Sequence, residues 1–328
     1  MRKLLLVAAV VLLAWAALVV PLPLAVTAPA PALAVPEVIA LEDDLRGELP
    51  DHVHLTVVRV ESATLVRAAG ALIIEEQELT FLPALLPPEM DQEQFERFQQ
   101  QLFDESVRAA LAVGLEAAGL EVAIDGDGAR IVDTVPGTPG AEAFEPDDVI
   151  IGIDGRGIGL ASELVALLGD RRAGEQVRVT VRRDGGELTR TVELAPLEGE
   201  VARVGLGVLV TTVDLQIDSP AEAEMIADGR IGGPSAGLML ALGAYDAATP
   251  EVLGGGRVIA GTGTIDLAGN VGPVDGIAAK VHGALLADAE VFLVPDAHIE
   301  QARDAAPPQL EVIGVTTLSD AIDALDDQ

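Results

Sequence analysis

The chain has 328 residues, enough for two modest domains and a further segment, and its content of 50% hydrophobic but only 2% aromatic residues requires mainly aliphatic cores. Its formal net charge of -33 argues against a nucleic-acid partner, because a protein that neutralises phosphates needs clustered Lys and Arg. The absence of cysteine excludes disulfides and thiolate chemistry, and the four histidines follow no established metal-ligand spacing, so we expect neither a metal nor another cofactor.

The first predicted element is a transmembrane helix. Arg2 and Lys3 precede an uncharged apolar run from Leu4 to Val20, which is close in length to a membrane span. Positive charges at the start of the run predict a cytoplasmic N-terminus and an exported remainder. We therefore expect residues 1–34 to comprise a single-pass anchor in the cytoplasmic membrane and a Pro/Ala-rich spacer that begins at Pro21. The alternative is cleavage at the A-x-A pattern of residues 32–34 and secretion.

Residues 35–121 are predicted to contain a strand and a long helix. The stretch from His52 to Val60 alternates between apolar and polar residues in a strand-like way. A helix is predicted over 92–118, with Asp91 as its N-cap. Its apolar stripe, which we expect to pack against the following domain, consists of Phe95, Phe98, Leu102, Val107 and Leu111.

Residues 122–196 are predicted to form a second, strand-rich domain. The run VPGTPGAEAFEPDDVIIGIDG over 135–155 is followed by a short helix and by a hairpin with its turn at 184–186. This pattern resembles the PDZ domains attached to bacterial exported proteases. The resemblance implies a small β-sandwich or barrel that binds an extended peptide in a groove. The acidic turn Asp125–Gly128 is the nearest candidate for a carboxylate-binding loop, but its charge disfavours an anionic ligand and no binding residue is assigned.

A serine follows a predicted tight turn in the last third of the chain. The sequence IGGPSAGLM spans residues 231–239, and the run from Ala236 to Ala244 is apolar and compatible with a helix. Ser235 is therefore predicted at a helix start, where unpaired amides and the helix dipole can stabilise a developing oxyanion. A serine in such a position is also a common helix cap, which is the alternative interpretation.

Lys280 is one of only two lysines in the chain, the other being Lys3. At helical spacing it shares a face with Ile277 and Ala284, which predicts a buried amine. Burial disfavours the ammonium form and lowers the pKa of a lysine, so the neutral amine becomes a plausible base for a neighbouring hydroxyl. The alternative is a lysine at the edge of the stripe whose charged end reaches water.

Three sequence segments, GGPSAG, GTGTIDLAGNVGPVDGIAAK and VFLVP, occur in the order and spacing of the proteolytic domain of Lon, peptidase family S16. The resemblance covers residues 201–328. It implies that Ser235 is the nucleophile, Lys280 the general base and Thr262 the residue that hydrogen-bonds the lysine. Candidates for the turn and the oxyanion site are Gly233, Pro234 and Ala236. The chain departs from Lon in having Gly232 in place of an acidic residue and Asp275 in place of a glycine.

The sequence thus predicts an α+β protein with a transmembrane helix, a PDZ-like domain and a Lon-type α/β proteolytic domain outside the membrane. We expect a serine-type endopeptidase that cleaves unfolded or flexible polypeptides. It should be independent of ATP, because no G-x-x-x-x-G-K-[ST] motif is present. The resemblance to Lon also implies a homo-oligomer, with a hexameric ring as the common assembly. The alternative is a non-catalytic membrane scaffold that binds polypeptides through its PDZ domain.

Overall fold

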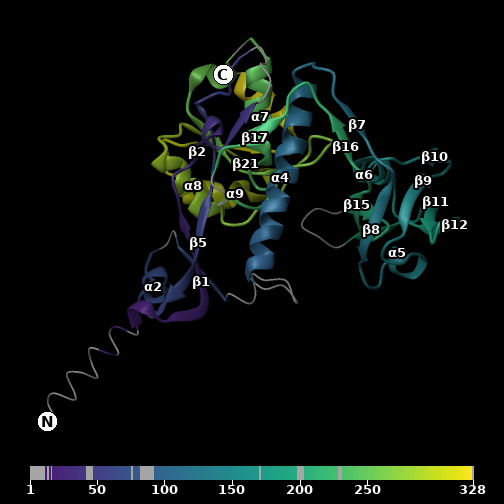
Figure 1. Cartoon of the computed structure of the whole chain (residues 1–328), viewed down its shortest axis with the longest axis horizontal. Helices are drawn as coiled ribbons and strands as arrows, with labels where there is room; N and C mark the ends of the chain where they lie inside the picture. The colour runs from purple at the N-terminus through teal and green to yellow at the C-terminus, as the bar shows by residue number, and fades with distance from the viewer. Residues whose placement is uncertain are drawn as a thin grey trace, which may run out of the picture. The chain divides into compact units, whose positions relative to one another are not determined.

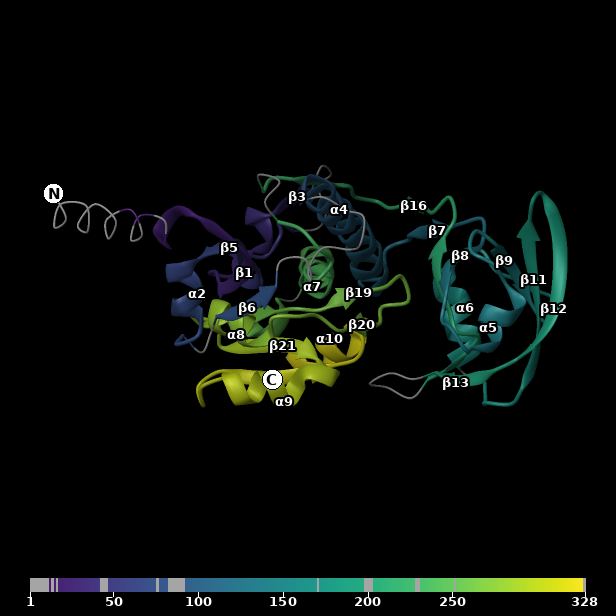
Figure 2. The same ribbon diagram turned by 90° about the horizontal axis from the view of Figure 1, so that it is seen from below.

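A computed structural model describes most of the chain and divides it into two units (Figures 1 and 2). The residues described are 12, 15, 17–41, 47–74, 77–81, 92–169, 171–197, 203–227, 231–250 and 252–326. The first unit joins residues 1–120 to residues 221–328, and the second consists of residues 121–220. The predicted segments 35–121 and 201–328 therefore do not follow one another as separate domains. They fold together, and the second unit is an insertion between them.

The main sheet of the first unit has five strands. Their order is β2 (Leu33–Ala34), β4 (Val53–Leu55), β18 (Ile259–Gly261), β21 (Val291–Pro295) and β22 (Glu311–Val315). The last four run parallel to one another, and β2 is antiparallel to β4. All five residues of β21 are buried, as expected for a parallel strand that is covered on both faces.

Helices pack around this sheet. They are α4 (Gln92–Ala117), α7 (Gly237–Ala248), α8 (Ile277–Leu286), α9 (Ile299–Ala305) and α10 (Leu318–Asp326), with 3-10 turns η1 (Val35–Glu37), η2 (Leu253–Gly256) and η3 (Asp296–His298). The apolar α7 is almost entirely buried, and α4 lies alongside it (Figures 1 and 2). Gly114 permits this approach, because a Cβ there would lie 2.3 Å from the carbonyl oxygen of Ala241.

The long helix predicted over 92–118 is confirmed as α4, although its predicted cap, Asp91, lies outside the described residues. Val107 and Leu111 of the predicted stripe are buried, whereas Phe98 is 38% exposed. The difference arises because the buried residues of α4 begin at Phe103, and this part of the helix packs against α7 within the same unit. The stripe therefore does not serve to pack against a following domain.

A small sheet at the beginning of the chain corrects the predicted spacer. β1 (Pro21–Pro29) lies between β5 (Val58–Thr64) and β6 (Glu78–Phe81), and α2 (Leu65–Ala71) covers one face. Its three prolines are compatible with a central strand, since Pro21 and Pro29 are terminal and Pro23 falls where the register shifts. Residues 21–29 are thus part of the folded unit.

The strand predicted from His52 to Val60 is two strands, because β4 pairs in the main sheet and β5 in the small one. Most of the predicted membrane segment from Leu4 to Val20 lies outside the described residues. Among the residues that are described, none belongs to a helix with the length and apolar character needed to cross a membrane. The remaining pairs of short strands in this unit are β3 (Ile39–Leu41) with β17 (Ala223–Met225), and β19 (Thr264–Ile265) with β20 (Val271–Gly272).

The second unit is built on one antiparallel sheet. The strand order is β12 (Gly186–Glu193), β11 (Gln176–Arg183), β9 (Val149–Ile153), β8 (Ala129–Thr134) and β15 (Val208–Thr212), with β10 (Arg156–Gly157) paired to β9. The helices α5 (Pro139–Ala143) and α6 (Ala161–Gly169) accompany it, and two further strand pairs are β7 (Ala123–Asp125) with β16 (Gln216–Asp218) and β13 (Ala195–Leu197) with β14 (Arg203–Gly205). The predicted hairpin is confirmed as β11–β12, with Asp184 and Gly185 both at positive φ.

The boundary of this unit lies beyond the predicted residue 196. The segment 208–217, assigned from the sequence to the start of the proteolytic domain, belongs to the second unit instead. The reason is strand pairing: β15 is antiparallel to β8, and β16 is antiparallel to β7. The unit therefore closes on itself with strands from both of its ends.

Candidate active site

Ser235 lies in the turn that precedes α7, and α4 holds this turn from the other side. The amide of Gly233 donates to the carbonyl oxygen of Gln99 at 2.9 Å. The hydroxyl of Ser106, a buried side chain on α4, donates to the carbonyl oxygen of Pro234 at 3.1 Å. Gly233 has φ +81°, a conformation that favours glycine. The half-buried Ser235 is therefore presented by a turn with two external supports.

The three candidates for an oxyanion site have different roles in the structure. The amide of Gly233 is occupied by Gln99, and Pro234 has no amide hydrogen, so both residues shape the turn and neither can donate to an oxyanion. In the part of the chain that the structure describes, the amides of Ser235 and Ala236 donate to no backbone carbonyl. Ala236 is thus the one candidate of the three with an available donor, directly before α7.

Thr262 links the lysine to the backbone of the serine. The Nζ of Lys280 donates to Thr262 Oγ1 at 2.9 Å, and Thr262 Oγ1 donates to the carbonyl oxygen of Ser235 at 3.0 Å. The amide of Gly263 donates to the same carbonyl at 2.9 Å. The structure therefore brings together the three predicted residues from the turn before α7, the end of β18 and helix α8.

Lys280 is buried, with an exposed fraction of 3%, so the alternative of a lysine that reaches water is wrong. Burial lowers the pKa of Lys280 to about 8, against a smaller opposing effect from the negative charge of Asp275. The helix itself begins after Gly276, which has φ +73°, without a side-chain cap. A substantial fraction of this amine is neutral near pH 8, which is the form that can accept a proton.

Close packing of the three segments depends on glycine. A Cβ on Gly237 would lie 2.9 Å from both the Ile265 amide nitrogen and Ser106 Oγ. A Cβ on Gly261, just before Thr262, would lie 2.8 Å from the carbonyl oxygen of Leu293. Any larger residue at these positions would push α7 away from β18, and with it the link between Ser235 and Thr262.

Sequence reasoning missed the contribution of α4 to the site. Ser106 occupies the buried face of that helix together with Phe103, Val107 and Ala110. A polar residue on an otherwise apolar helical face is a signal that could have identified it, because buried hydroxyls require partners. Within the described residues, no group of three or more His, Cys, Asp or Glu side chains is arranged to hold a metal ion.

In the second unit, the acidic turn Asp125–Gly128 is not a carboxylate-binding loop. The amide of Gly126 donates to Asp125 Oδ1 at 2.8 Å, that of Asp127 to Val213 O at 2.8 Å, and that of Gly128 to Gly159 O at 2.9 Å. These donors are therefore already used to connect the turn to neighbouring segments, and none remains for a peptide carboxylate.

The unit offers instead an edge strand beside a helix. β15 is the last strand of the sheet, so one of its edges has no strand partner in that sheet. The helix α6 is joined to it where the amide of Ala161 donates to Thr212 Oγ1 at 3.0 Å. Leu209 on β15 and Val165 on α6 are both exposed. Edge strands of this kind accept extended peptides by strand addition.

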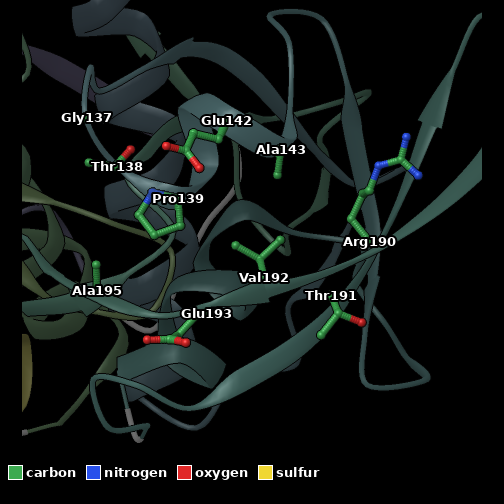
Figure 3. A pocket seen from close by; sticks show the side chains of 10 residues that line it. All are labelled: Gly137, Thr138, Pro139, Glu142, Ala143, Arg190, Thr191, Val192, Glu193 and Ala195. Carbon is green, nitrogen blue, oxygen red and sulfur yellow. The ribbon is translucent and has the colours of Figure 1, made fainter.

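An open depression elsewhere in the unit lies between α5 and β12 (Figure 3). It is lined by Gly137, Thr138, Pro139, Glu142, Ala143, Arg190, Thr191, Val192, Glu193 and Ala195. None of the predicted catalytic residues lies there. Its side chains mix both charges with small apolar groups and contain no nucleophile–base pair, so we assign it no chemistry.

Comparison with known proteins identifies the second unit. The family model described as PDZ domain matches residues 111–194. The magnetosome formation protease MamE of Paramagnetospirillum magneticum is 31% identical over 147 residues, which are 44% of this chain and 18% of that protein. The chain thus spans less than a fifth of the length of this curated relative.

Part of the chain is also similar to solved structures of bacterial proteins. The PDZ domain of an SdrC-like protein from Listeria monocytogenes is 18% identical, and the match covers 26% of this chain and 87% of that one with a TM-score of 0.24. A protein from Geobacillus thermodenitrificans is 30% identical over 25% of this chain and 95% of its own, with a TM-score of 0.23. On the family match, this mixed α+β chain contains a PDZ domain.

Proposed function

We propose that the chain is an ATP-independent serine endopeptidase of the Lon type, with Ser235 as the nucleophile and Lys280 as the general base. The observation that carries the proposal is the buried Lys280 amine, bound to Thr262 Oγ1, which in turn binds the Ser235 carbonyl. A buried lysine without a directly bonded carboxylate is costly to a protein. Such a residue is characteristic of sites that need a neutral amine.

The chemistry follows from these groups. The Ser235 hydroxyl attacks the scissile carbonyl carbon while its proton passes to the neutral Lys280 amine. When the tetrahedral intermediate collapses, the peptide C–N bond breaks and Lys280 returns the proton to the leaving amine. Water then attacks the Ser235 ester with Lys280 again as base, which releases the acid and restores the hydroxyl. The amides of Ser235 and Ala236, together with the start of α7, would stabilise the oxyanion.

The PDZ domain would supply polypeptide substrates to this site. The exposed edge of β15 suits the addition of an extended peptide strand, and main-chain hydrogen bonding of that kind selects flexible segments over folded ones. The relative's name identifies a protease, which is consistent with a PDZ domain in a proteolytic protein. We further propose that residues 4–20 anchor the chain, that both units lie outside the cytoplasmic membrane, and that the chain forms a homo-oligomeric ring.

The direct test is incubation of the full-length protein in detergent with unfolded casein, without nucleotide, beside a Ser235→Ala variant. We expect cleavage by the wild-type protein alone. Cleavage should increase with pH through about 8, because about a tenth of Lys280 would be neutral at pH 7 and half at pH 8. Thr262→Ala should retain part of the activity and move the pH midpoint, since Thr262 positions the amine. Equal cleavage by wild type and Ser235→Ala would disprove the proposal.

A second candidate function is a non-catalytic scaffold that binds polypeptides, and the PDZ match favours it specifically. Its signature would be retention of unfolded casein by both the wild-type and the Ser235→Ala proteins with no cleavage by either one. Binding that is lost from a protein with charged residues at Leu209 and Val165, but not from the Ser235→Ala protein, would place the binding site on the β15 edge.

A further inference from the structure

The helix α2 is apolar on both of its faces, which is unusual for a helix at the surface of a protein. Ala68 and Ala71 on its inner face pack with Val26 of β1 and Ala63 of β5. Leu65 and Val66 in its first turn, and Leu72 and Ile73 directly after its last residue, are all exposed, with Ile73 reaching 82%. These four residues flank the helix at both of its ends and leave its surroundings apolar. A helix covered only by water would carry polar residues at these positions.

Strand pairing places further exposed apolar groups beside this face. Pro21, at the start of β1, pairs with Thr64, the residue before α2. Leu24 of β1 pairs with Phe81, which is 53% exposed at the end of β6. The last residues before β1, including Val19 and Val20, are exposed as well. Figures 1 and 2 both show α2 next to the point where the chain enters β1. We call Leu65, Val66, Leu72, Ile73 and Phe81 the apolar cap.

The charge distribution indicates what covers the apolar cap. The chain carries 53 acidic residues, yet residues 4–36 contain no charged residue and residues 62–74 contain only Arg67. Arg67 forms an ion pair with Glu61. A strongly acidic protein is repelled by anionic lipid headgroups, so residues 62–74, which contain no acidic residue, can approach them more readily than the flanking Glu61, Glu75 and Glu76. In the sequence, the uncharged run of residues 4–20 leads directly into β1, the strand in which Leu24 pairs with Phe81.

We propose that the apolar cap inserts into the interfacial layer of a lipid bilayer, with α2 lying along the surface as a second membrane contact beside residues 4–20. Large exposed apolar patches on soluble units mark interaction surfaces, and helices with an apolar outer face bind in the headgroup and acyl-chain boundary. Two contacts, residues 4–20 before β1 and the apolar cap beside it, would fix the orientation of the first unit on the membrane. This placement does not depend on the catalytic proposal.

The absence of cysteine makes a direct depth measurement possible. Single cysteines introduced as Leu65→Cys and Ile73→Cys in the full-length chain would carry an environment-sensitive fluorophore. The matched control is Val252→Cys, an apolar position in the same unit whose exposed fraction of 58% equals that of Leu65 within one percentage point. Each protein is reconstituted into vesicles of phosphatidylcholine and phosphatidylglycerol, with or without lipid that bears a nitroxide near the headgroup.

We expect the emission from positions 65 and 73 to shift to shorter wavelength and to lose intensity with the nitroxide lipid, while position 252 changes in neither respect. Water-like, unquenched emission at both cap positions would overturn the proposal. Emission that shifts in lipid-free detergent as the protein concentration rises would overturn it too, because the apolar cap would then contact a second copy of the chain. Casein cleavage by each labelled protein provides an independent readout of the catalytic proposal.

Discussion

Among the described residues, each unit buries one charged group almost completely, and the two groups have opposite surroundings. Asp148 in the PDZ unit receives hydrogen bonds from Arg183 Nε and Nη2, both at 2.6 Å, and from the amide of Glu145 at 3.0 Å. Lys280 in the first unit hydrogen-bonds the neutral hydroxyl of Thr262. Both side chains are no more than 3% exposed. Burial alone therefore does not determine what a titratable group does.

The groups that surround Asp148 and Lys280 determine whether each side chain is charged. Burial by itself raises the pKa of Asp148, yet the Arg183 hydrogen bonds, the Glu145 amide and the guanidinium charge together lower it below its ordinary value. Burial lowers the pKa of Lys280 to about 8, and the charge of Asp275 only partly opposes this. Asp148 thus stays ionised as part of a structural ion pair, whereas Lys280 approaches the neutral form that general-base catalysis requires.

The largest effect on peptide hydrolysis should come from replacing Lys280 with arginine, and Arg183→Lys is the matched change in the PDZ unit. We expect Lys280→Arg to lower the rate of peptide hydrolysis about a thousandfold or more, because guanidinium does not release its proton at these pH values. The matched exchange Arg183→Lys should leave hydrolysis unchanged, since it alters only the ion pair of the PDZ unit. Lys280→Met, which fits the buried site without a charge, should be equally inactive and folded by circular dichroism. Wild-type rates for folded Lys280→Arg would exclude the lysine as base.

Breaking the ion pair between Asp148 and Arg183 should lower the stability of the PDZ unit without changing the rate of peptide hydrolysis. Arg183→Ala leaves the Asp148 carboxylate buried without its main partner, and we expect the PDZ unit to lose about 3 kcal/mol of stability. Urea denaturation measures this loss, and Arg190→Ala, a change to an exposed arginine on β12, is the control. Hydrolysis of a short peptide should be retained. A loss of less than about 0.5 kcal/mol would show that Asp148 and Arg183 do not form a stabilising pair.

Removing the Lys280 amine should stabilise the first unit, whereas Arg183→Ala should destabilise the PDZ unit. The pKa of Lys280 is about 8 in the folded chain and 10.5 as its ordinary value, so the folded state binds fewer protons between those pH values and its stability increases with pH there. The cost of the buried lysine is therefore greatest below pH 8. We expect Lys280→Met to be more stable than the wild-type protein by about 2 kcal/mol at pH 7. The pKa shift of Lys280 corresponds to at most about 3 kcal/mol, so the expected gain lies below that limit.

Urea denaturation at several pH values tests this prediction. The stability difference between Lys280→Met and the wild-type protein should decrease as the pH rises from 8 toward 10.5, because folding of the wild-type chain releases the Lys280 proton in this range and that release costs less at higher pH. A difference that does not vary with pH would contradict the assigned environment of Lys280. A Lys280→Met protein that is less stable than the wild-type protein at pH 7 would also contradict this environment.

The smallest effect is expected at Ser106, which supports the turn before Ser235 without contacting Lys280 or Thr262 in any hydrogen bond of the described residues. Ser106→Ala should lower kcat about threefold to tenfold through displacement of the turn. The pH midpoint should stay at its wild-type value, in contrast to Thr262→Ala. Ser62→Ala, a change to an exposed serine on β5, is the matched control. A shifted midpoint in Ser106→Ala would mean that α4 also acts on the lysine.

Local patterns were sufficient for several parts of this protein. The spacing of apolar residues predicted α4, the glycines and proline predicted the turn before α7, and the position of Lys280 on an apolar face predicted a buried amine. The hairpin of β11 and β12 followed from its turn residues. In each case neighbouring residues determine the conformation, so their order along the chain contains the information that is needed.

Only the tertiary structure decided the remainder, because it depends on pairings between distant segments. Residues 21–29 resembled a spacer until β5 and β6 were seen on either side of them, and 208–217 were assigned to the wrong domain until β15 was seen to pair with β8. The support of Pro234 by Ser106 joins residues 128 positions apart. Backbone hydrogen bonds and buried hydroxyls require partners, and no local pattern states where along the chain those partners lie.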